Sequence, residues 1–118
     1  MVGHTGNYKA TMQAVKAVDD CLRKLYSCLV KDRNFSLVIV GDHGNAEYMF
    51  DKVSTSPHTA HTLNPVPFIV AGKEYNKNEW QLENGTLCDV APTILNLMKI
   101  QKPLEMTGNN LLKRRHVY

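Results

Sequence analysis

The sequence predicts an α/β fold, because an amphipathic helix, two continuous apolar runs and a second short helix follow one another along the chain. The first helix is expected at about residues 7–31, where apolar side chains recur every three or four positions. These side chains are Met12, Val15, Val18, Leu22, Leu25 and Leu29. A stripe of this kind indicates packing of one helix face against a core.

Two strands are predicted, at residues 36–41 and 66–72. Both are short apolar runs without polar alternation, which is typical of a strand buried on both faces of a parallel sheet. Pro67 is expected at the start of the second strand, where no ladder hydrogen bond is lost. A polar loop is expected at residues 51–64, and a polar, turn-rich segment at residues 73–86.

A second amphipathic helix is expected from Cys88 to Ile100, with Asp89 as its N-cap or first-turn acid and Pro92 in its first turn. The basic residues 113–116 are expected to form a solvated end of the chain. Two strands are few for a complete sheet, since both would keep exposed edges. The chain therefore looks like part of a larger domain.

Composition excludes several classes of protein. The 118 residues carry a net charge of +3 and 43% hydrophobic residues, which is ordinary for a globular domain. The basic excess is too small to predict nucleic-acid binding, and no apolar run is long enough to predict a membrane helix. Cys21, Cys28 and Cys88 show no metal or disulfide spacing. These features, and an N-terminus without a signal-peptide pattern, predict a cytoplasmic protein with reduced cysteines.

Four of the five histidines lie in polar segments that adjoin regular elements. Asp42 and His43 directly follow the first predicted strand, where a carboxylate and an imidazole can both reach one divalent ion. His58 and His61 stand three residues apart in the long loop, and His4 lies between two glycines. Each pattern alone is common in proteins. Their convergence on one edge of a sheet would form a two-metal hydrolase or transferase.

The same segments carry a resemblance to a known family. Residues 3–8 (Gly-His-Thr-Gly-Asn-Tyr), 42–47 (Asp-His-Gly-Asn-Ala-Glu) and 57–62 (Pro-His-Thr-Ala-His-Thr) resemble the cofactor-independent phosphoglycerate mutases. Residues 64–67 (Asn-Pro-Val-Pro) and 105–108 (Glu-Met-Thr-Gly) are similar to that family too. The resemblance covers essentially the whole chain in the right order. It implies a partial three-layer α/β/α domain of the alkaline-phosphatase-like superfamily.

The resemblance also implies two manganese ions, or other divalent ions in their place, and a transiently phosphorylated serine. Asp42 and His43 would bind one ion, together with an aspartate and the serine from the N-terminal part of the family. His4 and His61 would bind the other ion, together with an aspartate that in the family directly precedes the match to Met1. No catalytic nucleophile is expected in this chain.

His61 is preferred to His58 as a metal ligand because the ligand in this superfamily precedes a short stretch ending in Val-Pro, here Val66-Pro67. His58 is assigned a contact with phosphate.

The resemblance further implies that residues 1–118 are the C-terminal part of the metal-binding, phosphatase-like domain. The serine-bearing N-terminal part and an inserted substrate-binding domain would lie outside this chain. The complete enzyme would interconvert 3-phosphoglycerate and 2-phosphoglycerate in glycolysis and gluconeogenesis, without bisphosphoglycerate. The chain by itself is expected to be inactive, with the remainder of the same enzyme as its partner.

Two other functions remain open from the sequence. The chain could be a non-catalytic metal-binding or interaction module derived from the same domain. It could also belong to another phosphoryl-transfer enzyme of the superfamily, such as a phosphopentomutase-like or phosphodiesterase-like protein. The segments at Ala46-Glu47 and at residues 58–61 argue against this second possibility.

Overall fold

The computed structural model describes residues 2–115 of the chain. It consists of helices and three small two-stranded sheets, so the predicted α/β class is confirmed. The helical elements are η1 (Val2–Thr5), α1 (Tyr8–Leu25), η2 (Tyr26–Asp32), η3 (Leu87–Asp89) and α2 (Val90–Leu97). The strands are β1 (Leu37–Val40), β2 (Phe50–Asp51), β3 (Ser56–Pro57), β4 (Phe68–Ala71), β5 (Trp80–Leu82) and β6 (Leu112–Arg114).

The long N-terminal helix forms where the apolar periodicity predicts it. Asn7 caps α1, because its side-chain oxygen accepts a hydrogen bond of 3.0 Å from the backbone N–H of Ala10. The helix continues without a break into η2, a π-helical segment that ends at Asp32. The helical run from Tyr8 to Asp32 therefore matches the expected range of about 7–31.

The central pair of strands, β1 and β4, is antiparallel, so the expected parallel sheet is wrong. Leu37 pairs with Ala71 at one end of the ladder, and Val40 pairs with Phe68 at the other. A parallel pair needs a crossover connection that usually contains a helix. The connection from β1 to β4 contains turns and the small β2–β3 hairpin but no helix, and an antiparallel return is the arrangement it permits.

The strands β5 and β6 were not predicted. β5 lies inside the segment expected to be turn-rich, and β6 overlaps the start of the expected basic end of the chain. They pair in antiparallel register, and the Arg114 guanidinium lies 5.3 Å from the centroid of the Trp80 ring. The basic end is therefore partly a strand. Its last residue, His116, lies outside the described residues.

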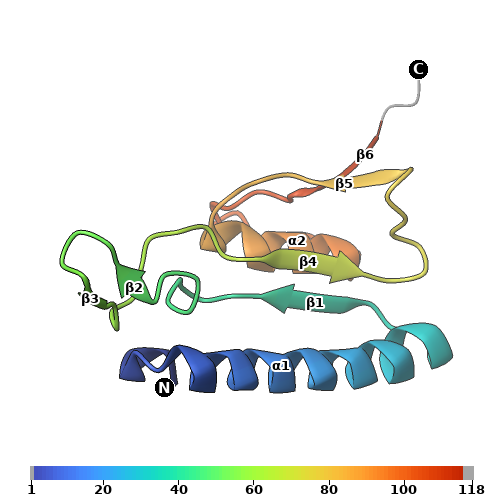
Figure 1. Cartoon of the computed structure of the whole chain (residues 1–118). Coiled ribbons are helices and arrows are strands. Elements are labelled where there is room, and N and C mark those ends of the chain that lie inside the picture. The colour runs from blue at the N-terminus through green and yellow to red at the C-terminus, as the bar shows by residue number, and fades with distance from the viewer. Residues whose placement is uncertain (1, 116–118) are drawn as a thin grey trace.

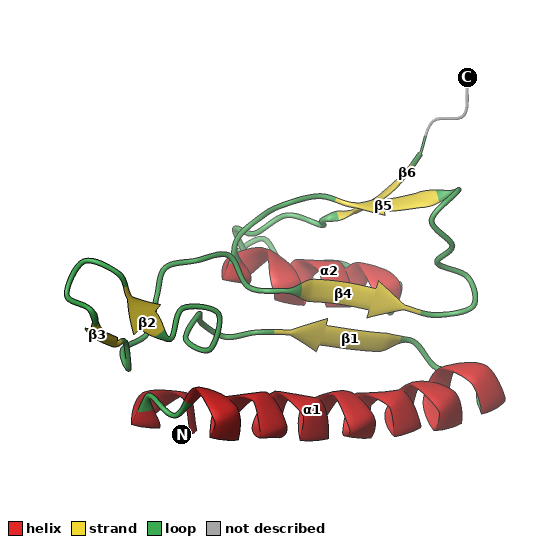
Figure 2. Ribbon diagram, in the orientation of Figure 1, coloured by secondary structure: helices red, strands yellow, loops and turns green. Residues whose placement is uncertain are grey.

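Figure 1 shows the elements in the spatial order α1, β1, β4, and then α2 together with the β5–β6 pair. The β2–β3 hairpin extends from the end of β1 that also adjoins the start of β4, as the colouring by secondary structure in Figure 2 makes clear. Among residues 2–115, no helix combines the length and the hydropathy that a bilayer span requires.

The core of this part of the chain is small. Among the described apolar residues, Val30, Met49, Leu111 and Leu112 are buried. The radius of gyration of the Cα atoms is 17.3 Å, whereas a compact chain of this length has about 13.5 Å. The helix stripe expected to pack in a core is largely exposed here, with 57% exposure at Met12 and 59% at Val18.

A polar clip holds the C-terminal segment against α2. Thr93 is fully buried, and its hydroxyl donates to the backbone oxygen of Asp89 at 2.8 Å and accepts from the backbone N–H of Leu111 at 2.9 Å. The Asp89 carboxylate accepts backbone N–H groups of Asn109 and Thr86, each at 2.7 Å. These hydrogen bonds, led by the one from Asn109, lower the pKa of Asp89. Asp89 thus completes a capping box with Thr86 and also binds the distant segment that contains Asn109.

Thr93→Val tests the hydroxyl in this clip. Valine has nearly the same shape but leaves the Leu111 N–H without an acceptor in a dry site. We expect the free energy of unfolding to fall by about 2–3 kcal/mol, measured by urea titration. Thr93→Ser is the matched control: it keeps both hydrogen bonds and should cost about 1 kcal/mol for the lost methyl group. Equal losses in the two variants would contradict the role of the hydroxyl.

The lowered pKa of Asp89 predicts a pH dependence of stability. A carboxyl whose pKa is lower in the folded state stabilises the fold above its ordinary pKa of 3.8 and loses this effect as pH falls through the folded value. Urea titrations should therefore show stability decreasing as pH drops below about 4. Asp89→Asn should be less stable than wild type at pH 7 and should respond less to acid. An Asp89→Asn variant with the acid response of wild type would refute this assignment.

Candidate metal centre

The antiparallel pairing of β1 and β4 brings two polar segments together. In an antiparallel pair, the chain that leaves one strand lies beside the chain that enters the other. The pairing continues past the strands: Gly41 N–H donates to the Pro67 oxygen at 3.1 Å, and Thr62 N–H donates to the Gly44 oxygen at 2.9 Å. The segment with Asp42 and His43 is therefore held next to the segment that contains His61.

Three of the predicted histidines converge at this edge. The rings of His43 and His61 are stacked, with centroids 3.6 Å apart and planes inclined by 19°. The Nε2 atoms of His4 and His61 lie 3.2 Å apart, although 57 residues separate them in the sequence. The expected convergence of the histidine-bearing segments is thus confirmed. Their role as metal ligands stays a prediction.

Backbone carbonyls determine which nitrogen atoms of His4 and His43 are free. The Nδ1 atom of His4 lies 2.6 Å from the Thr59 oxygen, and that of His43 lies 3.3 Å from the Gly44 oxygen. A carbonyl oxygen accepts hydrogen bonds only, so we assign the ring proton to Nδ1 in both histidines. Their Nε2 atoms then keep a lone pair in the neutral ring, which is the form that binds a metal ion.

Electrostatics favour the neutral form of His61 as well. Loss of surrounding water and the neighbouring imidazoles of His43 and His4 hold the pKa of His61 below its ordinary value of 6.5. A second and a third positive charge at this spacing would repel the first. The neutral ring of His61, a nitrogen donor, is therefore favoured at neutral pH.

Asp42 lies beside this cluster and is open to solvent. One of its carboxylate oxygens accepts the backbone N–H of His43 at 3.0 Å, and the other lies 3.5 Å from the Nε2 atom of His43. Its side chain is 88% exposed, so it is accessible to a ligand or to another segment of protein.

His58 lies apart from the three clustered histidines. Its ring packs edge-on against Tyr48 at a centroid distance of 4.9 Å, and its backbone N–H donates to the Met49 oxygen at 2.9 Å. Its buried Nδ1 atom has no hydrogen-bond partner among the described residues.

The Nε2 atoms of His4 and His61 are spaced like two ligands of one metal ion. Two nitrogen ligands at about 2.0–2.1 Å from one tetrahedral ion lie about 3.3 Å apart, close to the 3.2 Å between His4 and His61. Within residues 2–115, no group of three or more His, Cys, Asp or Glu side chains is arranged to hold an ion. The described part of the chain thus offers a pair of imidazoles and an adjacent carboxylate–imidazole pair, but no closed coordination shell.

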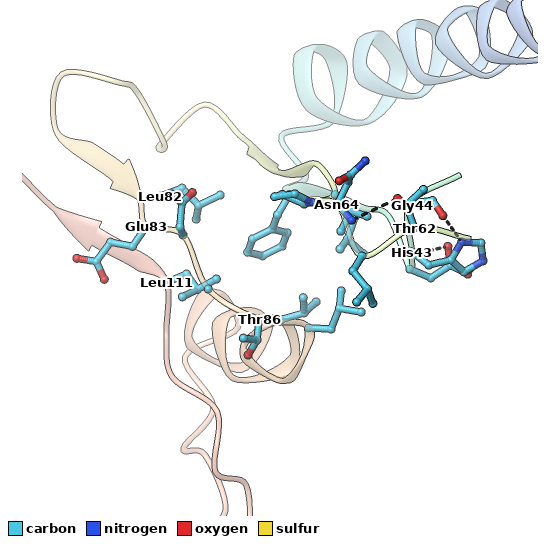
Figure 3. A pocket seen from close by; sticks show the side chains of 18 residues that line it. His43, Gly44, Thr62, Asn64, Leu82, Glu83, Thr86 and Leu111 are labelled. Carbon is cyan, nitrogen blue, oxygen red and sulfur yellow. Dashed lines mark hydrogen bonds and ion pairs between the residues drawn. The ribbon is translucent and has the colours of Figure 1, made fainter. Parts of the chain in front are cut away.

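A cavity of about 560 Å³ borders Asp42 and His43. Figure 3 shows His43, Gly44 and Thr62 on one side of it and Leu82, Thr86 and Leu111 on the other. Most of the other lining side chains are apolar, from β1, β4, α2 and the loops between them. No Lys, Arg or Ser is among the 18 residues that line it. The cavity therefore presents neither a cation for a phosphate group nor a serine nucleophile.

Sequence reasoning missed two polar residues at this edge, Asn45 and Glu47. Asn45 donates from its side-chain amide to the Ala60 oxygen at 3.0 Å. The Glu47 carboxylate accepts hydrogen bonds from Thr62 and Asn64. Both residues belong to the motif that follows His43, but nothing in their spacing predicts contacts with a segment some 15 residues away.

Comparisons with known proteins place the chain in a family. The family described as the metalloenzyme superfamily matches residues 1–102. The chain is 55% identical to the 2,3-bisphosphoglycerate-independent phosphoglycerate mutase of Ehrlichia canis over 97% of its own length. It is 54% identical to the protein of the same name from Wolbachia pipientis and 50% identical to that from Clostridioides difficile, over 95% and 97% of this chain. The match spans 21–22% of the length of these three relatives.

The stacking of the His43 and His61 rings predicts how His61 titrates. In NMR titrations of the imidazole signals, the pKa of His61 should lie below 6.5, because loss of surrounding water disfavours the charged ring and because that ring faces two other imidazoles. His43→Ala should raise the pKa of His61 toward 6.5. His58→Ala is the control and should leave it unchanged, since His58 packs against Tyr48 instead. A pKa of His61 that does not respond to His43→Ala would contradict the stacked arrangement.

Proposed function

Because this chain belongs to the metalloenzyme superfamily, we propose that it is the metal-ligand-bearing C-terminal segment of a 2,3-bisphosphoglycerate-independent phosphoglycerate mutase. The complete enzyme interconverts 3-phosphoglycerate and 2-phosphoglycerate in glycolysis and gluconeogenesis. The phosphoryl group passes to a serine hydroxyl elsewhere in the polypeptide and from there to the other hydroxyl of the glycerate, so bisphosphoglycerate is not required. The observation that carries this proposal is the identity of 50–55% to mutases across nearly the whole chain.

The clustered side chains support an assignment of metal ligands. His4 and His61 are assigned to one ion, and Asp42 and His43 to the other. The pair of Nε2 atoms 3.2 Å apart suits one shared ion, and Asp42 adds negative charge next to His43. Mixed imidazole and carboxylate donors suit manganese and also other divalent ions. The ions, when bound, would supply Lewis-acid stabilisation of charge on the transferred phosphoryl group.

The remaining roles of this chain are to orient those ligands and to contact phosphate. The backbone oxygens of Thr59 and Gly44 contact Nδ1 of His4 and His43, which leaves the Nε2 atoms to donate a lone pair to the ions. His58 is assigned a phosphate contact. The buried Nδ1 atom without a partner supports this role, because a buried nitrogen gains from a hydrogen bond that the described residues do not supply.

The remainder of the enzyme would complete the site. The cavity beside Asp42 contains two carboxylates and no cation, so it does not by itself favour an anionic phosphoglycerate. The serine, the cationic phosphate contacts, the further carboxylate ligands and an inserted substrate-binding domain are therefore placed outside residues 1–118. The exposed apolar stripe of α1 would pack against that remainder, because an apolar face of this kind is stabilised by removal from water. We place the complete enzyme in the cytoplasm.

The test of this function compares the 118-residue chain with a complete polypeptide that contains it. The complete polypeptide should interconvert the two phosphoglycerates in the presence of Mn²⁺, and His61→Ala should reduce kcat/KM by at least about 10-fold, as expected when a metal site is damaged. Glu74→Gln, in an exposed loop, is the control and should leave the activity unchanged. The chain alone should show no turnover at any concentration of Mn²⁺.

Two outcomes would overturn this proposal. Turnover by the chain alone that disappears in Asp42→Asn would place the nucleophile within these 118 residues. A complete polypeptide that binds Mn²⁺ but does not interconvert the phosphoglycerates would make the segment a non-catalytic metal-binding module.

A further inference from the structure

The segment that follows His43 makes contacts that the assignments above leave unexplained. Three segments carry the clustered histidines, and each is attached to another. His4 is bound to Thr59, and the amide of Asn45 is bound to the Ala60 oxygen. The hydrogen bonds between these segments are most numerous at Glu47, which is not adjacent in sequence to any proposed ligand.

The Glu47 carboxylate joins the two sides of the cluster. Oε1 accepts hydrogen bonds from the hydroxyl of Thr62 and, at 3.1 Å, from the amide of Asn64. Oε2 accepts the backbone N–H of Asn45 at 2.6 Å. Asn45 lies two residues after His43, and Thr62 directly follows His61. One side chain therefore sets the separation between the backbones that carry these two stacked rings.

The local backbone is built for this close approach. A side chain at Gly44 would collide with the Thr62 hydroxyl, and its Cβ atom would also lie 2.5 Å from Oε1 of Glu47. A side chain at Gly3 would collide with the side-chain oxygen of Asn45. Glycine at these two positions lets the three segments approach closely enough to share hydrogen bonds.

The donors also fix the charge state of Glu47. The hydrogen bond from Thr62 is the largest cause, and together with the backbone N–H groups it lowers the pKa of Glu47 to about 2. Glu47 is thus an acceptor only at neutral pH. A charged acceptor makes stronger hydrogen bonds than a neutral amide in the same place.

We propose that Glu47 is a positioning residue, which clamps the His43 segment to the His61 segment through Thr62 and Asn64 and so sets the relative geometry of the metal ligands. This inference rests on the ligand assignment proposed above. Glu47 contacts none of the clustered imidazoles in the described hydrogen bonds and ring contacts, so it acts through the backbones that carry them.

The test titrates a complete polypeptide that contains this chain with Zn²⁺ by calorimetry and with Co²⁺ by visible absorption, which reports the coordination geometry. Glu47→Ala should weaken binding by roughly 10-fold or more and alter the Co²⁺ spectrum, as loss of an outer contact to a metal ligand does. Glu47→Gln keeps one acceptor oxygen and should fall between wild type and Glu47→Ala. Glu74→Gln is the matched control and should bind both ions like wild type.

A second pair of variants separates positioning from a general effect on folding. Thr62→Val removes the hydroxyl donor and should reproduce the loss seen in Glu47→Ala, whereas Thr62→Ser keeps the donor and should restore binding to within about 3-fold of wild type, well short of that loss. Far-UV circular dichroism of the metal-free variants shows which of them fold. If Glu47→Ala does not fold, Thr62→Val and Glu47→Gln decide the question.

The inference would be overturned if folded Glu47→Ala or Thr62→Val bound Zn²⁺ with wild-type affinity and gave an unchanged Co²⁺ spectrum. A failure of the proposed ligand assignment is distinguishable from this result. In that case His61→Ala would leave Zn²⁺ binding intact. This result would contradict both the ligand assignment and the positioning role of Glu47.

Discussion

The antiparallel return of β4 along β1 is the constraint on which the rest of the arrangement depends. It places the residues that leave one strand beside those that enter the other, and the bridge between Gly44 and Thr62 carries that pairing beyond the ladder. The stacking of His43 on His61 follows directly from it. A parallel pair would have placed the start of β4 at the opposite edge, and the two histidines would have been separated by the length of a strand.

Hydrogen bonds join the segments that carry the histidines at this edge. The buried apolar residues of the described chain lie mainly at the end of the N-terminal helical run and beneath α2, as Val30, Leu111 and Leu112 show. Around the histidines, the segments are joined by carbonyl, amide and carboxylate contacts instead. Such contacts are directional, so they determine orientation as well as proximity. Orientation is what a set of metal ligands requires.

Much of this arrangement could be predicted from the sequence, since helices and short apolar strands depend on local patterns. The long N-terminal helix appeared where apolar periodicity predicted it, and both central strands appeared at the two continuous apolar runs. The motifs around Asp42 and His61 identified the edge that carries them. The direction of β4 was missed, because an apolar run alone does not reveal its pairing partner. β5 and β6 were missed for a related reason: three residues are too few for a pattern, and Lys113 and Arg114 read as solvated charges. The hydrogen bonds of Glu47 are tertiary contacts, which cannot be predicted from the spacing of residues in the sequence.

The proposed assignment of His4 and His61 to one ion has a consequence for metal selection. Imidazole nitrogen atoms follow the general order of divalent affinity, in which manganese binds more weakly than zinc or copper. A spacing of 3.2 Å between two such atoms suits all of these ions and discriminates poorly among them by size. Under that assignment, selectivity for a weakly binding ion would come from the carboxylate ligands that complete the site and from the concentrations of free metals around the protein. The two imidazoles would then supply part of the coordination shell without determining which divalent ion binds.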